Sequence, residues 1–205
     1  NEQLNEEKRM DIRKLQKKLV ILGCFLTIGF ITAAPEALII LAPNAREYWV
    51  AKWVIPPVAL GALAQYFYTN YVNVEIFYKK TPIIAVSSIL AAGINYCLNL
   101  WMIPIFGYIA AAYTTLFSYL FLLLFHFLAT RFVIKEKVYA DFYMFFMMGL
   151  SCVLGVMICA FYQDGYWLFR YLFAILLFGV LAFIERHDII LLVQYIKTHY
   201  GRRNK

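Results

Sequence analysis

Six apolar segments, each long enough to cross a lipid bilayer, follow one another along this chain. A transmembrane helix needs about 20 predominantly apolar residues, and each segment has about 18 to 30. The segments are residues 19–42, 49–78, 81–103, 107–132, 139–162 and 167–184. Short connectors separate them, so consecutive helices must run antiparallel. We therefore predict an all-α integral membrane protein with about six transmembrane helices in an antiparallel bundle.

The composition supports a membrane protein over a soluble one. Hydrophobic residues make up 63% of the chain and charged residues only 15%, which leaves too little polar surface to cover a globular domain. The net charge of +7 would suit nucleic acid, but the basic residues lie in clusters between apolar segments, as expected for contact with lipid headgroups. We therefore expect membrane lipids, and no nucleic acid, as partners.

The cysteines indicate neither disulfides nor a metal. All four lie inside apolar segments, at Cys24, Cys97, Cys152 and Cys159. A disulfide framework or a metal-binding knuckle would place them in loops at characteristic spacings. We interpret them as small apolar packing residues, and we expect no metal and no cofactor.

The positions of the basic residues predict the orientation. Lys and Arg are retained on the cytoplasmic side of a membrane during insertion. If the N-terminal end is cytoplasmic, 16 of the 19 Lys and Arg residues fall on that side, and only Arg46, Lys52 and Arg170 fall outside. We therefore predict that both ends of the chain are cytoplasmic.

The two ends are charged. Residues 1–18 lack an initiator Met and a signal-like apolar region, so we interpret them as a cytoplasmic loop or pre-helix segment within a longer protein. Residues 19–184 form the predicted six-helix transmembrane domain. Residues 185–205 form a basic cytoplasmic tail, whose apolar patch either lies along the inner leaflet or extends the last helix.

The segment of residues 49–78 carries a polar stripe, formed by Gln65, Tyr66, Thr69, Asn70 and Asn73. At about 100° per residue these side chains share an arc of about 140° on one helix face. The stripe either lines a polar cavity or forms hydrogen bonds to neighbouring helices in a packed core. On the opposite side, Glu75 precedes Lys79 by four residues, which predicts an interfacial ion pair rather than a coupling carboxylate. Pro56 and Pro57 predict a kink near the outer end.

Asn95 and Asn99 lie one helical turn apart in the next segment, so they share a face. They either line the same cavity or hydrogen-bond the helix to a neighbour. That helix is expected to end in a tight outer turn at residues 103–107, which includes Pro104 and Gly107.

Two further ionisable residues lie within apolar segments. Glu36 is near the outer end of the first segment, where it either pairs with Arg46 or Lys52 or serves as a coupling-ion site. His126 lies in the inner half of the fourth segment, where it either relays protons or is held by a hydrogen bond within the bundle. Asp141 and Asp164 stand isolated in the sequence, and no acid pair or His–Asp constellation for catalysis is evident.

An ordered set of short motifs resembles the bacterial polysaccharide flippases of the Wzx type, which export O-antigen or capsule units. These flippases belong to the multidrug/oligosaccharidyl-lipid/polysaccharide exporter superfamily. The resemblance covers the first four segments. It is carried by Ala34-Pro35-Glu36, Lys79-Lys80-Thr81, Asn95-Tyr96-Cys97-Leu98-Asn99, residues 103–112 and Thr114-Thr115.

The resemblance implies a transporter rather than an enzyme, and the C-terminal lobe of a two-lobed protein. It implies that polyprenyl-diphosphate-linked oligosaccharide is flipped across the bacterial cytoplasmic membrane by alternating access, for surface polysaccharide synthesis. The missing N-terminal lobe and the polysaccharide polymerase machinery would be partners. The pathway would be lined by the polar stripe, Asn95, Asn99, Arg46 and Lys52. A cation-coupled multidrug exporter of the same superfamily and a non-transporting membrane assembly subunit are the alternatives.

Overall fold

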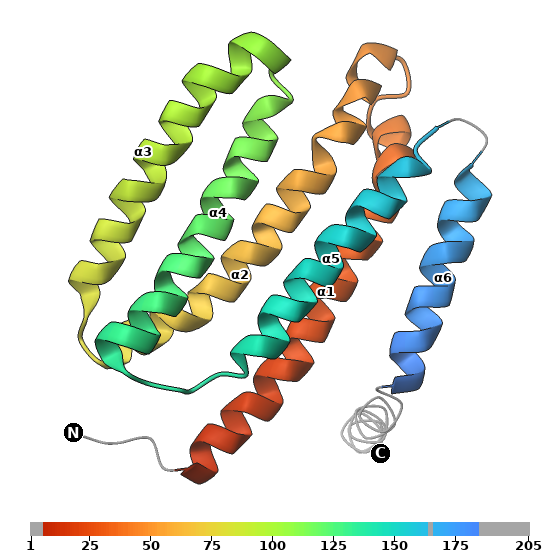
Figure 1. Ribbon diagram of the computed structural model, residues 1–205. Coiled ribbons are helices and arrows are strands. Elements are labelled where there is room, and N and C mark those ends of the chain that lie inside the picture. The colour runs from red at the N-terminus through yellow and green to blue at the C-terminus, as the bar shows by residue number, and fades with distance from the viewer. Residues whose placement is uncertain (1–5, 164–165, 185–205) are drawn as a thin grey trace, which may run out of the picture. The chain divides into compact units, whose positions relative to one another are not determined.

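The computed structural model describes residues 6–163 and 166–184, and over these residues every secondary-structure element is a helix (Figure 1). The elements are α1 (Glu6–Leu41), η1 (Arg46–Trp53), α2 (Ile55–Phe77), α3 (Thr81–Phe106), α4 (Ala110–Leu128), η2 (Ala129–Ile134), α5 (Asp141–Ala160) and α6 (Trp167–Ile184). Here η1 is a 3₁₀ helix and η2 a single π-helical turn. The chain divides into two compact units, Asn1–Ala160 and Phe161–Lys205. The predicted C-terminal tail lies outside the described residues.

Four helices are long and apolar enough to cross a membrane: α1, α3, α4 continued by η2, and α5. The chain therefore has the architecture of an all-α, multi-pass membrane protein. α2 has 23 residues, which is sufficient length, but its polar stripe and tyrosines make it less apolar than these four. The described apolar part of α6 is a shorter stretch, Trp167–Leu176.

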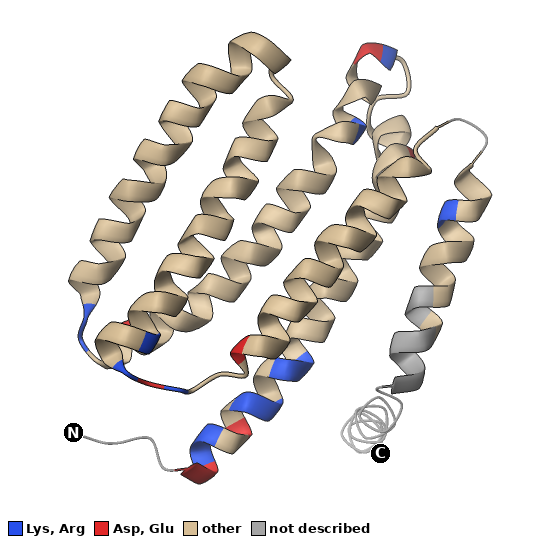
Figure 2. Ribbon diagram, in the orientation of Figure 1, with Lys and Arg blue, Asp and Glu red and all other residues tan. Residues whose placement is uncertain are grey.

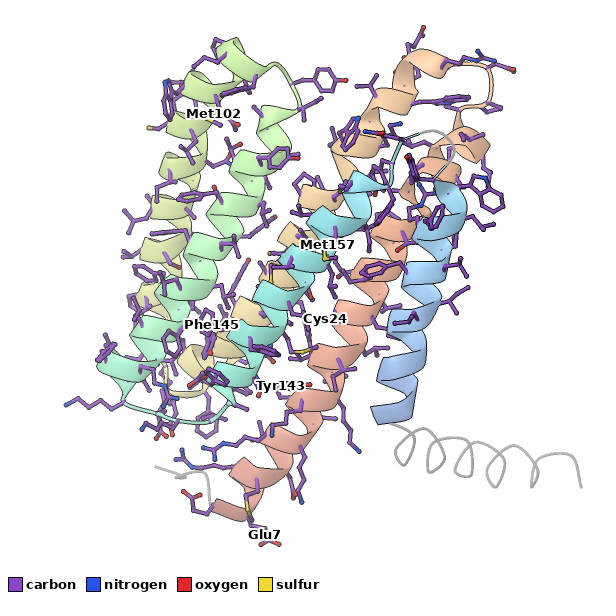
Figure 3. All side chains as sticks on the ribbon, turned by 45° about the vertical axis from the view of Figure 1, so that its right-hand side comes forward. Glu7, Cys24, Met102, Tyr143, Phe145 and Met157 are labelled. Carbon is purple, nitrogen blue, oxygen red and sulfur yellow. The ribbon has the colours of Figure 1, made fainter. Side chains whose placement is uncertain are left out.

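In the first unit, α2 occupies the centre. It packs against α4 on one side and against α1 and α5 on the other, while α3 packs mainly on α4. The core lies between these helices and includes Ile31, Phe67, Tyr71, Leu123 and Met144, all of which are fully buried. Side chains fill the space between the ribbons, and Cys24 lies where α1 meets α5 (Figure 3).

Two glycines allow close helix packing around α2. A Cβ atom on Gly61 of α2 would lie 3.1 Å from the Tyr119 ring of α4, and one on Gly155 of α5 would lie 3.4 Å from Leu60. Small residues at such contacts let helix backbones approach closely, and membrane helices depend on this because lipid gives them no hydrophobic driving force to associate.

α1 starts earlier than the apolar segment, because the charged residues from Glu6 onward are helical and continuous with it. With 36 residues, the helix is about 54 Å long at 1.5 Å per residue. A hydrocarbon core is about 30 Å thick. The N-terminal part of α1 therefore extends beyond the span as a helix and does not form a loop. Glu6 and Glu7 lie in its first turn, where their negative charges stabilise the helix by interacting with the positive end of its dipole.

The prediction of one kinked helix over residues 49–78 is wrong. η1 and α2 are separate elements, and Pro56 and Pro57 occupy the first turn of α2. At that position a missing N–H costs no hydrogen bond, and the fixed proline φ suits a helix start. The double proline therefore begins a helix.

The expected turn at residues 103–107 also begins later. α3 continues through Pro104 to Phe106 and stops at Gly107, whose φ is +74°. Such a positive φ is readily adopted by glycine. Gly107 also donates its N–H to the Ile103 carbonyl at 2.8 Å, which closes the helix end.

Charges collect at the two ends of the first unit (Figure 2). The basic end, as we name it, contains the start of α1, the α2–α3 turn with Lys79 and Lys80, and the segment from Arg131 to Lys137. Arg46 and Lys52 lie at the opposite end, in η1. The structure thus brings together three basic segments that are far apart in sequence.

The second unit contains α6, whose bounds coincide with the sixth apolar segment. Near its start, the Arg170 guanidinium lies over the rings of Tyr162 and Tyr171, at 5.5 and 5.3 Å from their centroids. These cation–π contacts hold the charge of Arg170 at the beginning of the helix.

Candidate functional site

The polar stripe lies on the face of α2 that faces away from the core of the first unit. Gln65, Thr69 and Asn73 are exposed, and Tyr66 and Asn70 are half-buried. The opposite face of α2 carries buried apolar residues at the same helical spacing, namely Leu60, Leu63, Ala64, Phe67, Tyr71 and Val74. The periodicity thus correctly separates the two faces of α2.

The hydrogen bonds of the stripe are local. The Thr69 hydroxyl donates to the Gln65 carbonyl at 2.8 Å, and the Asn70 amide donates to the Tyr66 carbonyl at 3.1 Å. The side chains of Gln65 and Asn73 make no hydrogen bond to any residue that the structure describes, and the buried Tyr66 hydroxyl has no partner there. The stripe makes no hydrogen bond from α2 to another described helix. The side chains of Gln65 and Asn73 can therefore hydrogen-bond a molecule in contact with this face.

A buried polar cluster lies on the other side of α2, near the basic end. Glu75 of α2, His126 of α4 and Ser87 of α3 are 0%, 1% and 0% exposed. The His126 Nδ1 atom is 2.8 and 2.9 Å from the two carboxylate oxygens of Glu75. Its Nε2 atom is 3.0 Å from the Ser87 hydroxyl. The Tyr68 ring stacks on the imidazole with 5.5 Å between centroids. This cluster joins three helices.

The predicted ion pair between Glu75 and Lys79 is therefore wrong. α2 ends at Phe77, and Lys79 lies in the turn that follows, with a φ of +57°. Without a continuous helix, the four-residue spacing no longer brings the two side chains together. Glu75 instead points into the bundle and finds His126, which is 51 positions away in sequence. A role of His126 in ion coupling stays a prediction. The residue is held in the bundle by its contacts with Glu75 and Ser87.

Asn95 and Asn99 form a second polar contact, at the opposite end of α3. The Asn99 amide donates to the Asn95 side-chain oxygen at 3.0 Å, and the Thr114 hydroxyl of α4 donates to Asn99 at 2.5 Å. Asn99 thus joins α3 to α4, which was one of the two interpretations of the pair, and Asn95 is bonded to Asn99 within α3. Their place in a substrate pathway stays a prediction.

The basic end has an interlocked set of ionic contacts. The Arg9 guanidinium donates to Glu136 at 2.7 Å, and the Tyr78 hydroxyl donates to the same carboxylate at 2.6 Å. The hydrogen bond from Arg9, reinforced by that from Tyr78, holds the pKa of Glu136 below its ordinary value despite partial burial. Arg13 donates to the backbone carbonyls of Lys137 and Val138. α1 is thereby tied to the connector before α5.

Asp141 is not isolated, contrary to the sequence interpretation. It accepts hydrogen bonds from the buried Tyr71 hydroxyl, at 2.8 Å, and from the Arg131 guanidinium, with which it forms an ion pair. Gln16 of α1 accepts a bond from the adjacent Ala140 backbone N–H at 2.9 Å. The start of α5 is thus fixed by partners from three other elements, which is a structural use of the carboxylate.

The cations at the opposite end contact aromatic rings. Arg46 lies over Trp49 and Lys52 over Trp53, each 5.7 Å from the ring centroid. Glu36 is half-buried near the end of α1, and its pairing with Arg46 or Lys52 stays a prediction. Within the described ranges, no three His, Cys, Asp or Glu side chains group as metal ligands.

No protein-family model, no curated protein and no solved structure matches this chain. The features of the chain that bear on its function are therefore the polar stripe, the buried cluster and the charge distribution.

Proposed function

We propose that this chain is part of a bacterial membrane transporter that flips polyprenyl-diphosphate-linked oligosaccharide across the cytoplasmic membrane. The observation that carries the proposal is the exposed polar stripe on the central helix of an otherwise apolar bundle. Unpaired amides and hydroxyls are costly in hydrocarbon. Polar groups within membrane spans almost always face a water-filled cavity or protein. The stripe therefore lines the wall of a transport pathway.

The chemistry of the stripe suits a glycan. Sugar hydroxyls need neutral donors and acceptors, and the side-chain amides of Gln65 and Asn73 supply both. A diphosphate needs positive charge, which Arg46 and Lys52 provide at one end of the pathway. The resemblance to polysaccharide flippases supports this assignment of substrate.

We infer that the whole protein is a two-lobed transporter. The chain crosses the membrane six times with both ends in the cytoplasm, and α2 and α6 are crossings in addition to the four apolar helices. It forms the C-terminal lobe and works by alternating access against an N-terminal lobe. The collection of three basic segments at one end of the first unit supports this orientation.

A second candidate is a cation-coupled multidrug exporter of the same superfamily. The buried Glu75–His126 pair favours it, because coupling a cation to transport requires an ionisable group inside the membrane. The two candidates differ in substrate. A drug exporter would give resistance to amphipathic cations, and its loss would leave surface polysaccharide unchanged.

Substitutions on the exposed face of α2 test the proposal in the full-length protein. Gln65→Leu and Asn73→Leu should each lower surface polysaccharide by about tenfold, the ratio that corresponds to 1.4 kcal/mol of lost interaction. Lipid-linked precursor should accumulate while the amount of protein in the membrane stays unchanged. Val58→Leu and Ile76→Leu change the same face without removing a polar group, so they should have no effect. Normal polysaccharide in both polar variants would refute the proposal.

A further inference from the structure

The Ser87 hydroxyl has two acceptors within reach but only one proton to donate. Its oxygen is 2.9 Å from the Ile84 carbonyl and 3.0 Å from the His126 Nε2 atom. The Ile84 carbonyl also accepts the Ser88 hydroxyl at 2.8 Å. That carbonyl therefore keeps a partner when Ser87 turns away from it. The direction of the Ser87 hydroxyl thus depends on what His126 offers.

One arrangement uses a proton on Nε2. The Ser87 hydroxyl then donates to Ile84, and its oxygen accepts the Nε2–H of His126. The Nδ1–H of the imidazolium points at the Glu75 carboxylate. Positive imidazolium and negative carboxylate make the pair neutral overall, and every polar group in it has a partner.

The other arrangement has one proton fewer. His126 keeps Nδ1–H toward Glu75, and the Nε2 lone pair accepts the Ser87 hydroxyl, which rotates away from Ile84. No polar group loses its partner, but the pair now carries one negative charge. The only bond that forms or breaks between the two arrangements is the N–H bond at Nε2.

We propose that Glu75, His126 and Ser87 form a site that binds and releases one proton in each transport cycle. The inference rests on the proposed transport function and names the ion that drives it. An isolated buried charge is costly, so the closed arrangement seen here favours the neutral, proton-bound pair. Separation of α3 from α4 would admit water to Nε2, lower that cost and release the proton.

The neighbouring titratable and charged groups do not replace these partners. Tyr68 of α2 stacks on the imidazole and Tyr119 of α4 stacks on Tyr68. Arg131, next along from α4, is paired with Asp141. Lys79 and Lys80 in the α2–α3 turn are exposed. The exchangeable proton is therefore held on Nε2 of His126, and Glu75 balances its charge through Nδ1.

Nitrogen NMR of the full-length protein in lipid bilayers, labelled with ¹⁵N-histidine, tests the site directly. The chain has three histidines, and His126→Gln identifies the signal of interest. As the pH is raised across the range in which the protein stays folded, Nε2 should change from protonated to unprotonated while Nδ1 stays protonated. An Nε2 signal that is constant over this range would overturn the proposal.

Two serine variants separate a proton site from simple packing. Ser87 and Ser88 are neighbours that both hydrogen-bond the Ile84 carbonyl, but only Ser87 contacts His126. Ser87→Ala should change the pH response of Nε2, and Ser88→Ala should leave it as in the wild type. Glu75→Gln should remove the imidazolium signal, because the anion that balances it is gone. A wild-type response in both Ser87→Ala and Glu75→Gln would contradict the assignment.

The outcome is separable from that of the transport proposal. Reconstituted protein should flip lipid-linked oligosaccharide faster when a proton gradient is applied, and Glu75→Gln should abolish that acceleration. If His126 titrates as expected but the stripe variants make normal polysaccharide, the proton site stands and the substrate assignment fails. If the stripe variants block polysaccharide and Nε2 does not respond to pH, the transport function stands and the proton site fails.

Discussion

The buried Glu75–His126 pair should respond asymmetrically to removal of one partner. Each side chain is almost fully inaccessible, at 0% and 1% exposure. His126 would keep its contact with Ser87 after Glu75→Leu, because that contact uses the other ring nitrogen. Among the described side chains, Glu75 has hydrogen bonds only to His126, so it would have none after His126→Leu. The two single substitutions therefore differ in what they leave behind.

The expected loss in free energy of unfolding depends on which side chain of the pair remains. A buried charge that loses its partner costs about 3–5 kcal/mol, which we expect for His126→Leu. A neutral imidazole with one unsatisfied nitrogen costs about 1–3 kcal/mol, which we expect for Glu75→Leu. Replacing both members of a buried pair by apolar residues of similar volume is often close to neutral. The double variant should therefore be more stable than either single variant.

Reversible unfolding in mixed micelles, driven by increasing SDS, measures these free energies as a double-mutant cycle. The partly exposed Arg9–Glu136 pair is the matched comparison, with side chains that are 14% and 17% exposed. Its single variants should cost less because water can reach the remaining group. The predicted order is refuted if the Glu75/His126 double variant is no more stable than either single variant, or if Glu75→Leu costs more free energy of unfolding than His126→Leu.

Two further predictions concern the ends of the bundle. Arg9 lowers the pKa of Glu136 in the folded protein. The contact therefore stabilises the protein above the ordinary glutamate pKa of 4.5, and this stabilisation is lost as the pH falls through the lowered value. Arg9→Leu should make the stability of this region less sensitive to acid, as measured by amide exchange in residues 135–140. If the proposed orientation is correct, a cysteine placed at Asn44 should react with an impermeant maleimide added to intact cells, and one placed at Lys135 should not. Labelling of position 135 from outside would contradict this orientation.

Apolar length locates the helices in this sequence better than it locates their ends. The residues before Leu19 are mostly Glu, Lys, Arg, Gln and Leu, which are good helix formers. Hydropathy therefore marks where α1 leaves an apolar environment and does not mark where the helix begins. Pro56 and Pro104 show the same limit, since one starts a helix and the other lies inside one. The consequence of a proline depends on which N–H it removes, and composition does not reveal this.

The polar stripe and the buried cluster differ in how far sequence predicts them. The stripe follows from the spacing within one helix, so its face is known before any tertiary contact. The cluster requires α2, α3 and α4 to be placed side by side, and its members are 39 and 51 positions apart. One signal was present. Glu75 lies near the inner end of its predicted segment and His126 in the inner half of its own, so both were expected toward the same side of the membrane.

The position of α3 links these features. Most of its surface is exposed and apolar, with only Ser87 and Ala91 buried, and apolar contact alone does not drive helices together in lipid. Polar bonds therefore hold α3 in place, through Asn99–Thr114 at one end and Ser87–His126 at the other.

The stripe and Glu75 share one rigid helix and point to opposite sides of it. A movement of α2 that carries Gln65 and Asn73 must also move Glu75 against the His126 imidazole, because the three residues lie on one continuous helix of 23 residues. Substrate bound at the stripe would favour one position of α2, and a proton on the pair would favour one as well. The stripe and the Glu75–His126 pair are then coupled through the movement of α2. If the proton changes the affinity of the stripe for oligosaccharide, bound oligosaccharide must change the proton affinity of the pair by the same factor.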